Sequence, residues 1–275
     1  MTELSPVASI LRAHDRDRFQ TALFARPPAR DALIALYAFD CEIGRVRHVV
    51  SQPMAGLIRL QWWRDALDGI AGGQPPGQPV ARAMQASWPL LGPHRALLET
   101  ALEAREVELD PAPFSTIADL DRHLAATSGG IGRVAALVLS PEPMAEAAAQ
   151  VHCAWGMVQL LADLEADRRQ DRSLVPSGLL RAAGVDVDRL AEVDDPQALR
   201  EPVRQLVDLA RKHLDAARHQ RPRGGVALPA LLLAKPASKA LRRLAKSGYD
   251  HRSPWRRTSP FAPLGLLLNH VRGRY

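Results

Sequence analysis

Cysteine is nearly absent from this sequence, which contains only Cys41 and Cys153 among 275 residues. Two cysteines so far apart provide neither a disulfide framework nor the paired spacing of a zinc site, so a reducing compartment is expected. Aromatic residues are also few, at 5%, and runs of β-branched residues are scarce. Both deficits disfavour strands and therefore a fold based on a sheet.

Long apolar runs are missing as well. No stretch approaches the roughly 18 apolar residues that a membrane helix needs, and residues 1–20 lack the apolar segment of a signal peptide. We therefore expect a mature cytoplasmic protein. Signatures of common enzymes are absent too, since the sequence has no G-x-S-x-G, no phosphate-binding G-K-[ST], no H-E-x-x-H and no credible pairing of cysteine with histidine.

Apolar residues do recur along most of the chain with the 3.6-residue period of a helix. Because 47% of the residues are hydrophobic and alanine and leucine are frequent, we predict an all-α protein with residues 1–275 in a single domain. Proline and glycine mark the predicted helix ends. His213 and His219 are expected to be exposed on the longest late helix. The main predicted helices cover residues 29–50, 53–70, 94–109 and 197–220, and a glycine-rich break is expected at 127–132.

Basic residues are concentrated in residues 235–275, which contain ten of them against a single acid, Asp250, in a chain of net charge +6. Such a segment can bind nucleic acid, anionic lipid or a diphosphate, or it can simply be exposed to solvent. No helix-turn-helix, zinc-finger or RNA-binding signature accompanies it, so we predict no nucleic-acid partner. Peripheral contact with the inner face of a membrane stays a candidate, and vesicle binding that weakens with salt would identify it.

Residues 152–176 carry the clearest pattern of polar residues. Asp163 and Asp167 lie one turn apart on the same face of a predicted helix, and Gln159 lies one turn earlier. Like charges at this spacing repel by about a few tenths of a kcal/mol unless a cation lies between them. Mg²⁺ is a suitable cation, because it is commonly held by one or two carboxylates together with substrate phosphates. From spacing alone, the commoner explanation is a solvated helix end neutralised by Arg168, Arg169 and Arg172.

The same stretch resembles the second aspartate-rich segment of squalene and phytoene synthases, in which an N-x-x-x-D-x-x-x-D helix leads into an R-x-x-L-P turn. The resemblance implies a single-domain, isoprenoid-synthase-like helical bundle around a central cavity, and a reaction that joins two prenyl diphosphates with the help of Mg²⁺. It further implies that Asp163 and Asp167 bind Mg²⁺, and that Gln159 and Arg172 contact the substrate.

Residues 29–50 resemble the first aspartate-rich helix of the same family, whose two acidic ligands would fall at positions 44 and 48. This chain has Gly44 and His48 there, although Asp40 lies one turn before Gly44 and can reach a cavity. The enzymes need carboxylates on both sides of the substrate, because Mg²⁺ is clamped between them. We therefore predict that Asp40 contacts the substrate and that catalysis is weak or lost.

Residues 35–65 most resemble one branch of the family, a mitochondrial assembly factor of respiratory complex I with the phytoene-synthase fold. Its pattern, A-x-x-A-F-polar-x-E-aliphatic followed by G-L-x-R-x-Q-aromatic-W, is matched from Ala35 to Ile43 and from Gly56 to Trp63. The first aspartate motif is absent from that branch too.

The resemblance leads to three functional hypotheses. The first is a diverged protein, weakly catalytic or non-catalytic, that binds a prenyl diphosphate or a similar lipid-like ligand and aids the assembly of respiratory complex I. The second is an active Mg²⁺-dependent prenyl transferase in which Asp40 or Glu42 replaces the lost ligands. The third is a helical scaffold that binds other proteins.

Overall fold

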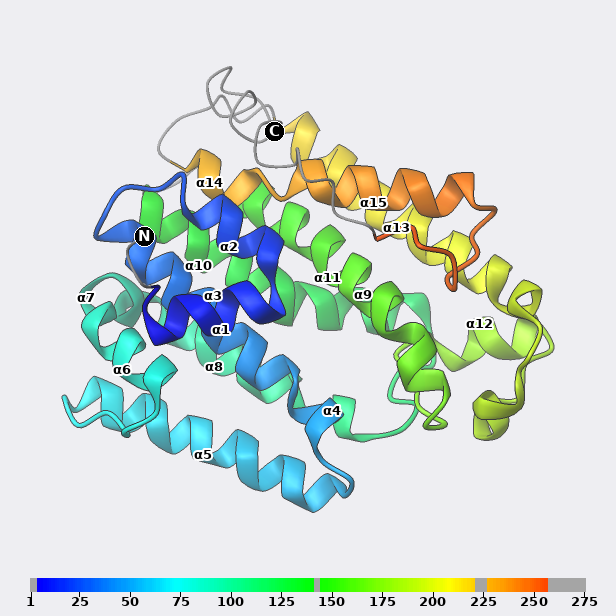
Figure 1. Ribbon diagram of the computed structural model, residues 1–275, viewed down its shortest axis with the longest axis horizontal. Coiled ribbons are helices and arrows are strands. Elements are labelled where there is room, and N and C mark those ends of the chain that lie inside the picture. The colour runs from blue at the N-terminus through cyan, green and yellow to red at the C-terminus, as the bar shows by residue number, and fades with distance from the viewer. Residues whose placement is uncertain (1–3, 141–143, 221–226, 257–275) are drawn as a thin grey trace.

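The computed structural model describes residues 4–140, 144–220 and 227–256 of the chain. All regular secondary structure in these ranges is helical, which confirms the all-α prediction. Figure 1 shows the helices arranged as a bundle around α11 (Ala145–Arg168), with α5 (Pro53–Ala71) along one edge and α15 (Ala234–Lys246) along the opposite one. In the described residues, no helix is long and apolar enough to cross a membrane.

The N-terminal third forms one side of the bundle. Its helices are α1 (Pro6–His14), α2 (Arg16–Ala22), α3 (Ala29–Gly44), α4 (Val46–Val49), α5 and α6 (Pro79–Ala86). The prediction of one helix over 29–50 was wrong, because α3 ends at Gly44 and the chain resumes as the short α4. This break matters for the site, since it lets Arg47 and His48 approach α11.

The middle of the chain contains α7 (Trp88–Leu91), η1 (Gly92–His94), α8 (Arg95–Ala104), η2 (Glu106–Leu109), α9 (Ile117–Leu124), a π-helical turn η3 (Ala125–Gly129) and α10 (Gly130–Leu139). The glycine-rich segment does not interrupt the helix as predicted. It forms a π-helical turn instead, which inserts extra backbone while α9 and α10 remain joined. Such a turn is typical of positions beside a functional site.

Helix α11 is the centre of the core. It packs against α10, η3, α13 (Arg200–His219) and α15, and its residues from Ala147 to Leu164 are largely buried. The remaining elements are α12 (Ser177–Ala182), η4 (Val187–Glu192), η5 (Pro196–Leu199) and α14 (Leu228–Leu231). The predicted last helix, residues 261–275, lies outside the described residues.

His213 corrects a second prediction from the sequence. It is buried on α13, with Nδ1 2.6 Å from the side-chain oxygen of Gln150 and Nε2 2.9 Å from a carboxylate oxygen of Asp121. These two partners come from α11 and α9, so they could not be inferred from the sequence around His213. His219 is exposed, as expected.

Candidate functional site

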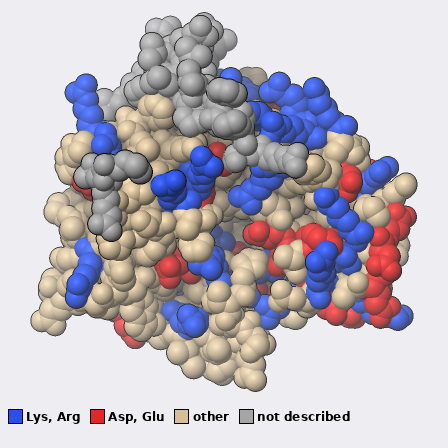
Figure 2. Space-filling view, in the orientation of Figure 1, with Lys and Arg blue, Asp and Glu red and all other residues tan. Residues whose placement is uncertain are grey.

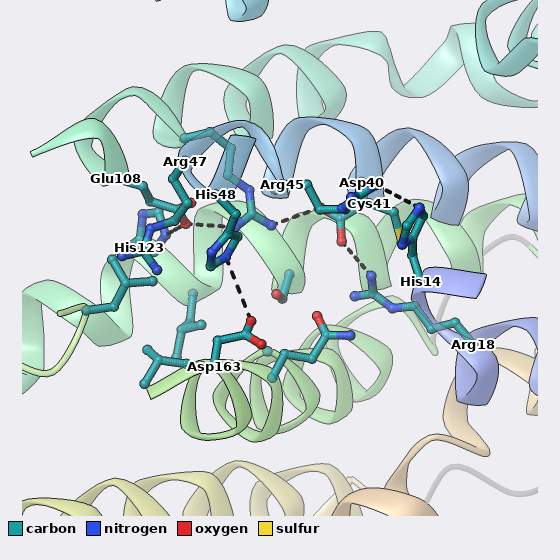
Figure 3. Close-up of a pocket in the computed structure, with 18 of the residues that line it drawn as sticks. His14, Arg18, Asp40, Cys41, Arg45, Arg47, His48, Glu108, His123 and Asp163 are labelled. Atoms are coloured by element: carbon teal, nitrogen blue, oxygen red, sulfur yellow. Dashed lines mark hydrogen bonds and ion pairs between the residues drawn. The ribbon is translucent and has the colours of Figure 1, made fainter. Parts of the chain in front are cut away.

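A pocket of about 310 Å³ lies beside α11, between α1, α2, the end of α3 and α4 (Figure 3). Its lining residues include five arginines, three carboxylates and three histidines. Apolar lining is limited to a few leucines. A pocket with more fixed cations than carboxylates is suited to an anionic group. The five arginines are Arg18, Arg45, Arg47, Arg105 and Arg256.

Asp40 lies in this pocket, as predicted, but it is held by two arginines. Its carboxylate accepts a hydrogen bond of 2.5 Å from Arg18 Nη1 and one of 3.0 Å from Arg105 Nη2. Burial alone would raise the pKa of Asp40, yet these two guanidinium groups hold it below its usual value. Asp40 is therefore an ionised carboxylate whose charge is already neutralised by the protein.

Arg105 lies against Gly44, one of the two positions at which the resemblance predicted an acid. A Cβ atom on Gly44 would lie 3.3 Å from the Arg105 guanidinium carbon, so a side chain there would crowd it. Arg105 also donates to Glu108 at 2.7 Å, and Glu108 in turn lies 2.7 Å from His123 Nε2. Burial alone would raise the pKa of Glu108, but Arg105 and His123 lower it to about 2. A guanidinium group thus takes the space beside position 44.

Asp167 is likewise neutralised by an arginine. Its Oδ2 lies 2.7 Å from Arg47 Nη1, and both side chains are almost fully buried. His48, the other position at which the resemblance predicted an acid, points at the same helix, with Nδ1 3.5 Å from Asp167 and Nε2 3.9 Å from Asp163. Figure 3 shows His48 directly opposite Asp163. Arg47 and His48 of α4 therefore lie beside Asp163 and Asp167, where the sequence predicted a bound cation.

Asp163 is the most accessible of these carboxylates, with 47% of its side chain exposed. Partial burial raises the pKa of Asp163, and the neighbouring charge of Asp167 raises it further, against the effect of His48. Asp163 is the one carboxylate of the pocket without an arginine hydrogen bond in the described structure.

Gln159 and Arg172 have structural partners as well. The Gln159 amide donates to Asp15 at 2.6 Å, and Trp155 Nε1 donates to the same oxygen at 2.9 Å. Arg172 donates at 2.6 Å to the backbone oxygen of Arg47, which fixes α4 beside α11. Gln159 lines the pocket, whereas Arg172 does not.

Two buried arginines have unused donors. Arg18 is only 1% exposed, and its Nη2 has no hydrogen-bond partner; Nη2 and Nε of Arg47 also lack partners. Buried guanidinium donors are normally satisfied, because an unpaired one loses the hydration of a charged group. Since both side chains line the pocket, an oxygen-rich anion is a fitting partner for them.

The π-helical turn shapes the back of the pocket. Ser128 of this turn and Gly156 of α11 both line it, and a Cβ on Gly156 would lie only 2.4 Å from Ser128 Oγ. Glycine is therefore required at 156 for the turn to approach α11 this closely.

The donor set fits a Mg²⁺ clamp poorly. Within residues 4–140, 144–220 and 227–256, no group of three or more histidine, cysteine, aspartate or glutamate side chains is placed to hold a metal ion. Asp40 and Asp167 already neutralise arginines at hydrogen-bond distance. The sequence prediction brought Asp40, Gln159, Asp163 and Asp167 to one region, but it missed Arg18, Arg47, Arg105, Glu108 and His123.

The fold and this pocket define a class of protein. Residues 11–261 match the squalene/phytoene synthase family, so the chain belongs to that family. This match confirms the resemblance predicted from residues 35–65 and 152–176. The likeness to the complex I assembly factor is confirmed by the relative described next.

Assembly factor 6 of NADH dehydrogenase (ubiquinone) complex I from Bos taurus is 25% identical over 273 residues, which cover 97% of this chain and 81% of the relative. Phytoene synthase from Thermus thermophilus is 29% identical over 66% of this chain and 62% of its own length. Among solved structures, a dehydrosqualene synthase in complex with a ligand has a TM-score of 0.79 at 18% identity, covering 97% of this chain and 94% of its own. This last likeness confirms the fold.

Proposed function

We propose that this protein is a diverged, weakly catalytic or non-catalytic member of its family that binds a prenyl diphosphate or a similar lipid-like ligand. In this proposal, arginines supply the positive charge that neutralises the diphosphate. Mg²⁺ is then not required for binding. Asp163 is the carboxylate best able to share a Mg²⁺ ion with the phosphate oxygens, so the experiment below measures the contribution of Mg²⁺ directly.

The observation that carries the proposal is the pairing of buried arginines with the family's acidic positions. Arg47 is bound to Asp167, and Arg105 lies against Gly44. Both arginines line the pocket, as does Arg18, and buried donors of Arg18 and Arg47 have no hydrogen-bond partner. A dissociating diphosphate needs metal on both sides for catalysis, whereas binding needs only complementary charge and hydrogen bonds.

The active transferase is the second candidate, and the side chains named for it are poorly placed. Asp40 is occupied by Arg18 and Arg105. Glu42 does not line the pocket; it lines a neighbouring groove with Arg59 and Trp62. The scaffold hypothesis requires neither ligand nor metal, and it predicts no response to either.

Thermal unfolding with and without Mg²⁺ and farnesyl diphosphate separates the three hypotheses, with released pyrophosphate measured in the same samples. A ligand that binds only the folded state stabilises it by about 2.7 kcal/mol at a hundredfold excess over Kd. For a chain of this size that is a rise in Tm of roughly 5–10 °C. We expect this rise with farnesyl diphosphate alone, in wild type and in Asp163→Ala, without release of pyrophosphate.

Arg45→Gln is the variant expected to lose ligand binding and therefore the rise in Tm. Arg45 is half-buried in the pocket, and its hydrogen bond is to His14 Nε2 at 2.7 Å, so its replacement should leave the core intact. Arg59→Gln, on the exposed face of α5, is the control. A shift that needs Mg²⁺ and disappears in Asp163→Ala would contradict the proposal. Release of pyrophosphate at enzyme-like turnover would favour the transferase, and no shift would favour the scaffold.

The likeness to complex I assembly factor 6 supports a second part of the proposal, a role in the assembly of respiratory complex I. Cells lacking this protein should then assemble less complex I, which gel electrophoresis of native membranes measures. Wild type should restore assembly, whereas Arg45→Gln should not if ligand binding is needed. Normal assembly in the cells that lack the protein would refute the role.

A further inference from the structure

The exposed apolar side chains of the described residues are gathered in one place. Eight large apolar side chains are exposed, and six of them lie on α4, α5 and η2, which pack together. Met54 and Ile58 are each 64% exposed and, with Trp62, follow one another at intervals of one helical turn along α5. Apolar side chains clustered in this way indicate an interaction surface. We call this surface the α5 face; it consists of Val49, Met54, Leu57, Ile58, Trp62 and Val107.

The α5 face lies on a preformed helix. The opposite side of α5 is buried through Leu60, Trp63 and Leu67, so the helix is held in place without any partner. Figure 1 places α5 along the edge of the bundle, and the corresponding lower margin of Figure 2 is largely free of charged side chains. A flat surface can therefore approach it without obstruction by neighbouring helices.

Charge is sparse on this face and mostly of one sign. Between Pro53 and Trp62 the exposed side chains include one charged group, Arg59. Beside it, a groove of about 450 Å³ is lined by Val46, Val49, Trp62 and Trp63, together with Arg45, Arg59 and one acid, Glu42. Arginine stems lie along apolar surface while their heads reach phosphates, and tryptophan prefers the boundary between water and hydrocarbon.

The polar side chains farther along α5 are already paired within the protein. Gln61 donates to Asp65 at 2.8 Å, and Arg64 bonds Gln61 and Glu106. What the α5 face offers is aliphatic and tryptophan surface with arginines at its border, which is the composition of a helix lying in a membrane interface.

We propose that the α5 face rests on the surface of a lipid bilayer, with Arg59 contacting anionic headgroups. This proposal goes beyond the proposed function and does not depend on it. It also differs from the candidate membrane contact considered from the sequence, which was the basic segment of residues 235–275. The described part of that segment includes α15, which contains Lys235, Lys239, Arg242, Arg243 and Lys246 and lies along the edge of the bundle opposite α5 (Figure 1). A bilayer that meets the α5 face cannot meet α15 at the same time.

The test is partition of the full chain onto vesicles of phosphatidylcholine with and without phosphatidylglycerol, in the absence of any prenyl diphosphate. Wild type should bind the anionic vesicles. The double variant Met54→Glu/Ile58→Glu should lower the partition coefficient by about tenfold or more, because charged side chains are expelled from the interface. Both residues are so exposed that the fold should tolerate the change. Leu23→Glu, at a 45% exposed position outside the α5 face, is the matched control and should bind normally.

A second measurement does not depend on acidic variants. The emission of Trp62 is obtained as the difference between the spectra of wild type and Trp62→Phe. On vesicles this emission should shift to the blue, and brominated acyl chains should quench it. Absence of wild-type binding, or an unquenched Trp62 in bound protein, would overturn the proposal. So would loss of binding in Lys239→Glu/Arg242→Glu with full binding in the α5 variant, which would assign the contact to α15. A dimer in solution that the α5 variant makes monomeric, without vesicle binding, would assign the face to a second copy of the chain.

Discussion

Replacing Arg47 with methionine tests whether an arginine has taken the position of a cation beside the aspartates of α11. Arg47 and Asp167 are 2.7 Å apart, and their side chains are only 3% and 5% exposed. Methionine keeps most of the packing volume and removes the charge, so Asp167 is left buried without its partner. Breaking a buried ion pair from one side costs about 3–5 kcal/mol. The backbone oxygen of Arg47, which accepts the hydrogen bond of Arg172, is unchanged.

For a chain of this size we expect Tm to fall by roughly 10 °C, measured by circular dichroism. The double variant Arg47→Met/Asp167→Leu should recover most of this loss, since it leaves no unpaired charge. Mg²⁺ should stabilise Arg47→Met, because Asp163 and Asp167 are then free to share the ion, and it should have little effect on wild type. Equal stabilisation of the two proteins by Mg²⁺, or an unchanged Tm in Arg47→Met, would refute the reasoning.

Two further predictions concern the remaining supports of the pocket. Because the pKa of Glu108 is lowered to about 2 from 4.5, its contribution to stability is complete above about pH 5 and is lost as the pH falls towards 2, a change of about 3 kcal/mol. Glu108→Gln should therefore flatten the fall in Tm across this range in an acid titration, and an unchanged slope would contradict the assignment. Gly156→Ala should destabilise by about 1–3 kcal/mol through its contact with Ser128. Ser128→Gly should restore most of that loss in urea unfolding, and a lack of rescue would show that the strain lies elsewhere.

The helices themselves were largely predictable from local sequence. Pro53 and Gly72 delimit α5 as expected, because proline suits the first helical turn and glycine favours its end. The end of α3 at Gly44 was missed, since the residues after it keep an apolar pattern that suits a helix. The π-helical turn at 125–129 was also missed, because glycines that normally break a helix here permit close packing against α11.

The candidate site was predicted only in part, for a physical reason. The aspartates of α11 are found from spacing within one helix, but their partners come from distant segments. Asp167 was expected to bind Mg²⁺ or, as part of a solvated helix end, to be neutralised by nearby arginines such as Arg168. It is bound instead by Arg47, 120 residues earlier in the chain. Arg168 and Arg169 instead bind Glu165. The available signal was Gly44 and His48 at positions where the resemblance places acids, because a weakened metal clamp leaves the aspartates of α11 to be neutralised by side chains of the protein.

The most direct test of the account is a calorimetric titration of the protein with farnesyl diphosphate in EDTA, repeated in Mg²⁺. If arginines neutralise the diphosphate, binding occurs in EDTA, its Kd changes little when Mg²⁺ is added, and Arg45→Gln weakens it under both conditions. Binding that appears only with Mg²⁺, and that Asp163→Ala abolishes, would contradict the account.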